Sequence, residues 1–159
     1  MRPKPFIPQP LDGKGLYVRD RTSGLAWHRC SLRTLYADTD RSTAVYHANY
    51  LRYFEFGRAS LMRDAAYAYR EIEESGYTYP VISTALEYFS PLGYDDAMYI
   101  HTRPAELQRV KLRFDYVITH ASNGEIVTIG FTRHCAVNSK GRPVSIDNMT
   151  LELWNNFPV

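Results

Sequence analysis

Two carboxylates and an imidazole stand close together in one segment of the chain, YADTDRSTAVYHANYLRYFEFGR, which runs from Tyr36 to Arg58. Asp38 and Asp40 are separated by one residue, and His47 follows seven residues after Asp40. A carboxylate held beside an acyl group can act as a nucleophile or as a general base on water. Activated acyl esters react with such groups without a metal or a cofactor, so we expect neither. The candidate catalytic residues are Asp40 and His47.

The element that must position these groups is a helix. From Asn49 to about Tyr67 apolar side chains recur at spacings of four, three, four and four: Tyr50, Phe54, Gly57, Leu61 and Ala65. This is the stripe of an amphipathic helix, and at about 1.5 Å per residue the helix is roughly 27 Å long. A helix start offers unpaired N–H groups and the positive end of the helix dipole. We expect the backbone N–H groups from His47 to Asn49 to bind the oxyanion of an acyl-transfer transition state.

Each of these side chains also has a structural interpretation, and the spacing alone leaves both open. An aspartate before a helix is more often an N-cap or a solvated loop residue than a catalyst, and His47 could bond to a neighbouring carbonyl. Asp38 is expected to be solvated or to form a turn. Glu55 lies off the apolar stripe and three residues before Arg58, so we expect it to form a structural ion pair.

The remainder of the chain indicates strands. Asn123-Gly124 is a strong hairpin turn, and apolar and polar residues alternate in residues 27–36, 82–88, 98–100, 110–118 and 127–137. A short helical piece is expected at about 70–75, and a last strand from Thr150 to Trp154. One long apolar helix with this many strands must be wrapped by them. We therefore predict an α+β fold with an antiparallel sheet of five or six strands around one long central helix.

The length of 159 residues predicts a single domain, here residues 16–159. Residues 1–15 are rich in proline and are expected to form an extended N-terminal arm with no structure of its own.

The composition excludes several classes of function. A net charge of +2 without a basic block gives no reason to expect a nucleic-acid partner. The two cysteines, Cys30 and Cys135, are expected to be free thiols in a reducing compartment. The N-terminus lacks the apolar run of a signal peptide, and no run of about 18 apolar residues could cross a membrane. The cytoplasm is the expected location. The 13 tyrosines favour a sheet that self-associates.

The segment YADTD followed by VYHANYLRYFE resembles the signature of the 4-hydroxybenzoyl-CoA thioesterase family, and within it the branch associated with the Tol-Pal envelope system. The similarity continues through residues 69–74, 80–81, 93–96 and 140–143, over about residues 28 to 147. The resemblance implies a hotdog fold, in which an antiparallel sheet wraps the central helix. It also implies homodimers or homotetramers with active sites at the dimer interface. It places the family's catalytic aspartate on Asp40 and its motif histidine on His47.

One position departs from the family pattern. The family usually has a glycine three residues after its catalytic aspartate, and this chain has Thr43 there. A β-branched residue is stiff and disfavours positive φ, and it fills space beside the thioester, so we expect an effect on the size of the acyl group. The candidate substrate-binding residues are Thr43, Tyr46, Ala48, Asn49 and Arg142. Arginine and lysine pair with the phosphates of coenzyme A, and the candidates for this role are Arg109, Lys111, Arg113, Lys140 and Arg142.

Three functions remain as hypotheses. The first is an acyl-CoA thioesterase that releases a free carboxylic acid and coenzyme A, with Asp40 as nucleophile or general base. The second is a thioesterase that acts on acyl carrier protein. The third is a hotdog protein that binds acyl-CoA, or assembles with a partner, without catalysis, and Thr43 is the feature that favours it.

Overall fold

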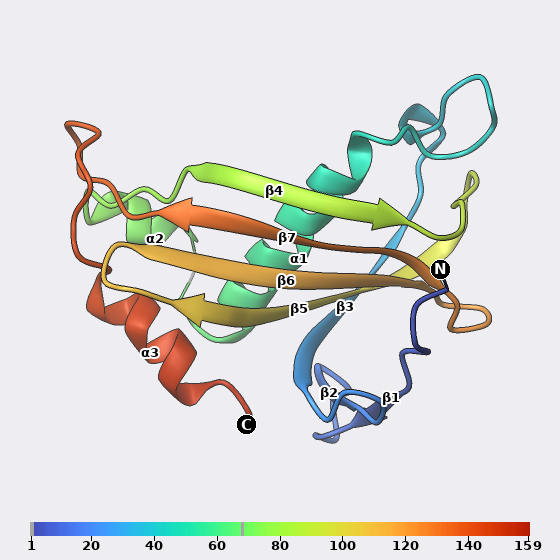
Figure 1. Cartoon of the computed structure of the whole chain (residues 1–159), viewed down its shortest axis with the longest axis horizontal. Helices are drawn as coiled ribbons and strands as arrows, with labels where there is room; N and C mark the ends of the chain where they lie inside the picture. Colours follow the sequence, from blue (N-terminus) through green and yellow to red (C-terminus); the bar gives the residue numbers. More distant parts are fainter. Residues whose placement is uncertain (1, 68) are drawn as a thin grey trace.

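The computed structural model describes residues 2–67 and 69–159, and within them it shows one antiparallel sheet (Figure 1). The seven strands of this sheet have the order β1-β2-β3-β5-β6-β7-β4 in the described part of the chain. Their bounds are Pro8–Pro10 for β1, Tyr17–Asp20 for β2, Ala26–Arg33 for β3, Val81–Tyr88 for β4, Ala97–Leu107 for β5, Lys111–His120 for β6 and Ile126–Cys135 for β7. The helices are η1 (Tyr36–Asp38), α1 (Asn49–Asp64), α2 (Tyr69–Glu74) and α3 (Asn148–Asn156).

Helix α1 lies diagonally across one face of the sheet, as Figure 1 shows. The predicted apolar stripe is buried there, and the Phe54 ring stacks on Tyr116 of β6 with centroids 4.3 Å apart. A Cβ on Gly57 would lie 2.6 Å from side-chain atoms of Ile100 and Thr102 on β5. Because no side chain fits in that gap, the glycine allows the helix backbone to approach the sheet closely. The α+β architecture and the long helix are confirmed, and α1 ends at Asp64 instead of near Tyr67.

The number of strands exceeds the five or six expected, because the N-terminal arm contributes β1. The prediction that the arm has no structure of its own is wrong. β1 pairs with β2 in the register Pro8↔Asp20, and the Asp20 carboxylate accepts from the Ile7 N–H at 2.9 Å. Phe6 is buried against the Trp27 ring. Prolines tolerate this position because β1 is an edge strand, where half of the N–H groups need no partner.

The last element is a helix and not the strand expected from Thr150 to Trp154. Asp147 caps the start of α3, since its carboxylate accepts from the Thr150 N–H at 3.0 Å and from the Thr150 hydroxyl at 2.7 Å. Thr150 and Leu153 are buried at helical spacing. In the described residues no helix is long and apolar enough to cross a membrane.

Candidate active site

The segment between β3 and α1 forms a small hairpin that ends at the start of α1. Thr39 and Val45 form an antiparallel bridge. The Asp40 N–H donates to the Ala44 carbonyl at 3.0 Å, and the Thr43 N–H donates to the Asp40 carbonyl at 3.0 Å. Asp40 therefore stands at the first position of a tight turn.

The Asp40 carboxylate is exposed and is held by one neighbour. Its Oδ1 accepts from the Ser42 N–H at 2.8 Å and from the Ser42 hydroxyl at 2.5 Å. These two bonds lower the pKa of Asp40, and the charge of a protonated His47 lowers it further. The carboxylate is consequently ionised at neutral pH and carries a free oxygen, which is the state that a nucleophile requires.

Thr43 adopts the conformation that a β-branched residue disfavours. Its φ is +70°, in the left-handed region. Its hydroxyl donates to the Ser42 carbonyl at 2.5 Å, and the neighbouring Ala44 bridges to Gly93. The turn keeps the geometry that glycine would adopt without strain, with threonine in its place.

The start of α1 presents backbone donors beside His47. The N-cap Ala48 has no side-chain cap, and the described residues supply no acceptor for the N–H groups of His47 and Ala48. The Asn49 N–H is not available as an oxyanion donor, because it bonds to the Tyr46 carbonyl at 2.9 Å. Of the three amides expected from the sequence, two are therefore free to bind an oxyanion.

A cavity of about 360 Å³ adjoins His47. Its wall is formed by the hairpin, the first turn of α1 and the end of β4, with the residues Ala44, Val45, His47, Tyr50, Tyr88, Phe89, Ser90 and Pro91. The Tyr88 hydroxyl donates to the His47 carbonyl at 2.7 Å and fixes the wall to the loop. Ser90 Oγ lies 3.2 Å from His120 Nε2. The cavity is mainly aromatic, with a polar group at Ser90, as in sites that bind small molecules.

Asp38 is buried, so the expectation of a solvated residue is wrong, whereas the alternative expectation of a turn residue agrees with its place in η1. The residue is 3% exposed and its side chain 4%. Oδ2 accepts from the Leu35 N–H at 3.0 Å and from the Tyr53 hydroxyl at 2.9 Å, and Oδ1 lies 3.2 Å from Arg52 Nη1. Burial alone would raise the pKa of Asp38, but hydrogen bonds from Leu35, Tyr53 and Arg52 outweigh it, so the pKa lies below its ordinary value.

The backbone of Asp38 ties the hairpin to α1. Its carbonyl accepts from the Tyr46 N–H at 2.9 Å and from the Asn49 side-chain amide at 2.8 Å. Asn49 therefore supports the loop through its side chain, whereas Tyr46 and Ala48 are exposed. Asp38 is the residue whose role sequence analysis missed, because its donors at Arg52 and Tyr53 lie a long way along the chain.

Glu55 and Arg113 do not have the contacts that their predicted roles require. Arg58 is buried and donates to the Tyr116 hydroxyl at 2.9 Å, and exposed Glu55 forms no ion pair in the described part of the chain, so the predicted pair is wrong. Arg113 is paired with Asp115 at 2.6 Å and with Glu106 at 3.4 Å. It is therefore not a free cation for a phosphate.

Arg142 lies at the other end of the sheet from Asp40 within one chain. It belongs to a turn after β7, where its N–H donates to the Asn138 side chain at 3.1 Å. That end of β7 pairs with Val81, at the start of β4, whereas Tyr88 at the end of β4 bonds to His47. An eight-residue strand separates the two places by about 24 Å.

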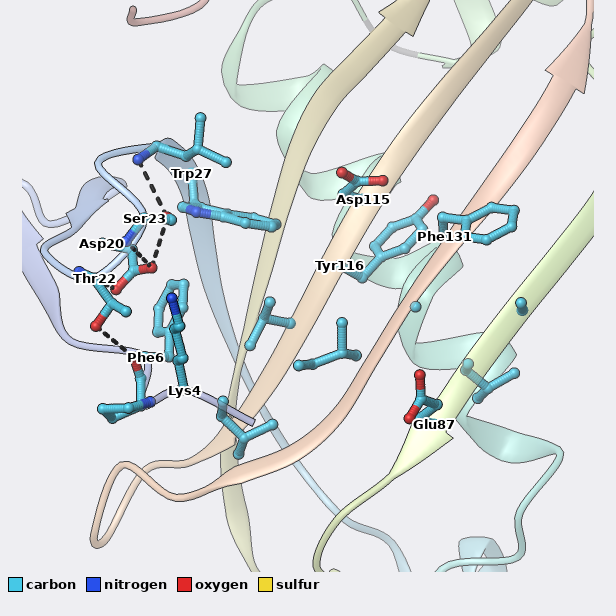
Figure 2. A pocket seen from close by; sticks show the side chains of 18 of the residues that line it. Lys4, Phe6, Asp20, Thr22, Ser23, Trp27, Glu87, Asp115, Tyr116 and Phe131 are labelled. Atoms are coloured by element: carbon cyan, nitrogen blue, oxygen red, sulfur yellow. Dashed lines mark hydrogen bonds between the residues drawn. The ribbon is translucent and has the colours of Figure 1, made fainter. Parts of the chain in front are cut away.

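A second cavity, of about 450 Å³, lies on the sheet face opposite α1. Figure 2 shows it with Phe6 and Trp27 on one side and Glu87 and Phe131 on the other. Asp40 lines neither cavity, but His47 lines the cavity of about 360 Å³ and not this one, so the cavity beside His47 is the candidate acyl site.

Comparison with known proteins matches residues 35–153 to the Thioesterase-like superfamily. An Aquifex aeolicus protein named as a candidate esterase is 32% identical over 121 residues, which cover 76% of this chain and 92% of that protein. The acyl-CoA thioester hydrolase YbgC of Shigella flexneri is 28% identical over 95 residues, covering 60% of this chain and 71% of that protein. The crystal structure of a hypothetical Aquifex aeolicus protein aligns with a TM-score of 0.75 and 31% identity, over 79% of this chain and 98% of that one.

A sheet over one long helix, with a carboxylate hairpin at the helix start, defines a hotdog-type thioesterase fold. The chain belongs to the Thioesterase-like superfamily, since the matched segment spans most of it, and it is a thioester hydrolase. The arm and the first three strands precede the matched segment.

Proposed function

We propose that the protein is an acyl-CoA thioesterase, which hydrolyses a thioester to a carboxylic acid and coenzyme A with Asp40 as nucleophile or general base. The observation that carries this proposal is the ionised Asp40 carboxylate on a hairpin that leads into the two free amides of the α1 start. The name of the YbgC relative, an acyl-CoA thioester hydrolase, supports coenzyme A as the thiol carrier. The similarity of the YADTD segment to the 4-hydroxybenzoyl-CoA and Tol-Pal-associated enzymes supports the same class of substrate.

Asp40 has two chemical roles open to it. As a nucleophile, its free oxygen attacks the thioester carbonyl, the C–S bond breaks with departure of the thiolate, and water hydrolyses the resulting anhydride. As a general base, it takes a proton from a water that attacks the same carbon. The N–H groups of His47 and Ala48 bind the oxyanion in both routes, and His47 orients the water or the substrate. The lowered pKa of Asp40 keeps the carboxylate ionised, which both routes require.

The cavity beside His47 supports a specific place for the acyl group. The rings of Tyr50, Tyr88 and Phe89 supply apolar surface, and Ser90 supplies one polar contact. Thr43 lies on the hairpin that borders this cavity and does not line it. Its effect on the acyl group therefore acts through the position of the hairpin.

The assembly that completes the site is a homodimer through β4, which can pair further into a tetramer. β4 is an edge strand of eight residues with one charge, Glu87, and its side chains Val81, Ile82 and Tyr88 are each 49% exposed. An apolar edge of this length pairs with another strand unless it is protected. The opposite edge, β1, has three residues of which two are proline, so it is already protected.

Antiparallel pairing of β4 with its copy gives Arg142 a function. It places the start of the partner's β4 beside the end that bonds to His47. The turn that carries Arg142 of the partner subunit then reaches the cavity of the first protomer. A guanidinium at that place can pair with the phosphates of coenzyme A.

The proposal is tested with a panel of acyl-CoA thioesters and an assay for thiol release. We expect hydrolysis of at least one member and its loss in Asp40→Asn. Parallel assays on acyl carrier protein esters separate the two possible thiol carriers, and binding of acyl-CoA without thiol release would mean that the protein is non-catalytic. Single turnover in ¹⁸O-labelled water that places the label in the Asp40 carboxylate would establish the nucleophile role, because a general base never bonds to the oxygen of the water.

A further inference from the structure

Three cations surround a cavity of about 430 Å³ at the far end of α1 from Asp40. Arg63 comes from the last turn of α1, Arg29 from β3, and Lys14 from the turn of the N-terminal arm. Arg63 lies fourteen positions after Asn49, so this cavity is separated from the start of the helix by about 21 Å. It is therefore distinct from the candidate active site.

The positive charge of this cavity is only partly neutralised by the residues that line it. None of the three cations forms an ion pair among the residues that the structure describes. The carboxylate that lines the cavity, Asp64, is bound to the buried His28 at 2.7 Å. Burial lowers the pKa of His28, so Asp64 keeps its own negative charge, and three cations beside one carboxylate still leave a local excess of positive charge, which favours an anionic ligand.

Arg29 is held in position by its neighbours. Its Nε donates to the Gly15 carbonyl at 3.3 Å, and its guanidinium lies 4.6 Å from the centroid of the Tyr99 ring. Glycine at position 15 leaves room for this guanidinium, because a Cβ there would lie 3.1 Å from Arg29 Nη2. Gly15 also has a φ of +70°, which glycine adopts without strain. A guanidinium that is already fixed loses little entropy when it binds a phosphate in its planar fork.

The remaining wall offers hydroxyl groups and an exposed ring. Ser31 and Ser60 line the cavity with the cations. Phe56 is 40% exposed and also lines the adjoining cavity between Leu32 and Arg52. An aromatic ring beside a cationic pocket suits a base attached to a phosphate, since bases stack on exposed rings.

We propose that this cavity binds a nucleoside phosphate, with Lys14, Arg29 and Arg63 on the phosphates and Phe56 against the base. The ligand is either a free nucleotide or the nucleotide end of coenzyme A, and both share this chemistry. Binding of a free nucleotide stands apart from the proposed function, whereas binding of the nucleotide of coenzyme A rests on it and replaces the phosphate contact assigned to Arg142.

The test is calorimetric titration of the full chain with ADP, with inorganic pyrophosphate and with adenosine. We expect saturable binding of ADP and pyrophosphate, weakened about tenfold by Arg29→Met, Arg63→Met or Lys14→Met, because each removes one charge-assisted contact. Phe56→Ala should weaken the binding of ADP and leave the affinity for pyrophosphate unchanged, because pyrophosphate has no base. Arg70→Met is the matched control, since the Arg70 side chain is 89% exposed on α2 and does not line the cavity.

The outcomes separate the sources of the ligand. If the same variants raise KM for an acyl-CoA but not for the corresponding acyl-pantetheine, the ligand is the nucleotide of coenzyme A. If both KM values are unchanged while ADP binding is lost, the ligand is a free nucleotide. Lys14 and Arg63 are exposed, so their variants carry the test even if Arg29→Met does not fold. The proposal is wrong if neither ADP nor pyrophosphate binds, or if the three variants bind them as the parent does.

Discussion

Two aspartates two positions apart have opposite surroundings, and the proposed function assigns catalysis to the exposed one and support of the loop to the buried one. Asp40 is exposed and bonded to Ser42, whereas Asp38 is 3% exposed and bonded to both ends of the loop. We expect Asp40→Asn to lower kcat on the order of 10²–10⁴-fold, as for loss of a nucleophile or general base. Its thermal midpoint should stay at the parental value, because no buried group loses a partner. An Asp40→Asn variant that folds and hydrolyses at the parental rate would show that the carboxylate assignment is wrong.

Asp38→Asn should lower the stability of the protein more than its kcat, the reverse of Asp40→Asn. An asparagine keeps an acceptor but loses the charge that faces Arg52, so we expect a loss of about 1–3 kcal/mol in the free energy of unfolding. The fall in kcat should be smaller than for Asp40→Asn, since Asp38 positions the hairpin and does not reach the substrate. Denaturant titration of both variants in one buffer measures the two free energies. Equal stability of parent and Asp38→Asn would contradict the supporting role.

The same residue predicts a dependence of stability on pH. The pKa of Asp38 is lowered in the fold from an ordinary value of 3.8. Its stabilising contribution is therefore complete above that value and is lost as pH falls through the folded pKa. The difference in unfolding free energy between parent and Asp38→Asn should be constant near neutrality and should shrink below about pH 4. A difference that grows on acidification would contradict the direction of the shift.

The sequence could predict that this segment contains candidate catalytic carboxylates but not which aspartate is exposed. The spacing of Asp38 and Asp40 is visible in the chain, and burial is not. Burial of Asp38 depends on donors from Arg52 and Tyr53, which approach only when α1 folds back along the loop.

At the scale of elements, the hairpin of residues 39–45 contains a strained residue. A side chain at positive φ costs about 1–2 kcal/mol, and glycine removes this cost while adding about 0.4–1 kcal/mol of unfolded-state entropy. Thr43→Gly should therefore stabilise the chain by up to about 1 kcal/mol, which raises the thermal midpoint by about 2–4 °C. It should also widen the range of accepted acyl groups, because the hairpin gains freedom beside the cavity.

Ala66→Gly is the matched control for this element. Ala66 has a φ of +64° just after α1, far from the hairpin in the chain. It should gain similar stability without any change in acyl selectivity. Scanning calorimetry and the acyl-CoA panel together check the pair, and a selectivity change in Ala66→Gly alone would contradict the local role of Thr43.

The helices α1 and α3 show which patterns in the sequence were sufficient to predict a helix and which were not. The stripe of α1 predicted its start at Asn49 because burial follows the period of the helix. The strand expected near Thr150 was wrong because four or five residues of mixed pattern fit both periods. The Asp147 cap, with Thr150 three residues on, was the local signal for a helix.

At the scale of the whole molecule, the structure of the arm and the proposed dimer depend on contacts between distant segments. The prolines of the arm indicated an absence of structure, yet Asp20 and Trp27 supply partners for Ile7 and Phe6. Composition could predict self-association in general terms, but only the sheet order shows that β4 is the unprotected edge.

The β4 edge gives the last prediction, which tests assembly and the shared site together. In the proposed dimer each site uses Asp40 from one protomer and Arg142 of the partner subunit. Asp40→Asn should abolish turnover, and Arg142→Met should lower kcat/KM by about tenfold or more through loss of a phosphate contact. Mixing the two variants after unfolding and refolding should restore about a quarter of the parental sites, since half of the dimers are mixed and each has one intact site.

Ile82→Lys on β4 should give monomers by light scattering and prevent this recovery, whereas Leu107→Lys, also exposed but on β5, should not. A monomeric parent with full activity, or no recovery in mixed dimers, would mean that the site is complete within one chain.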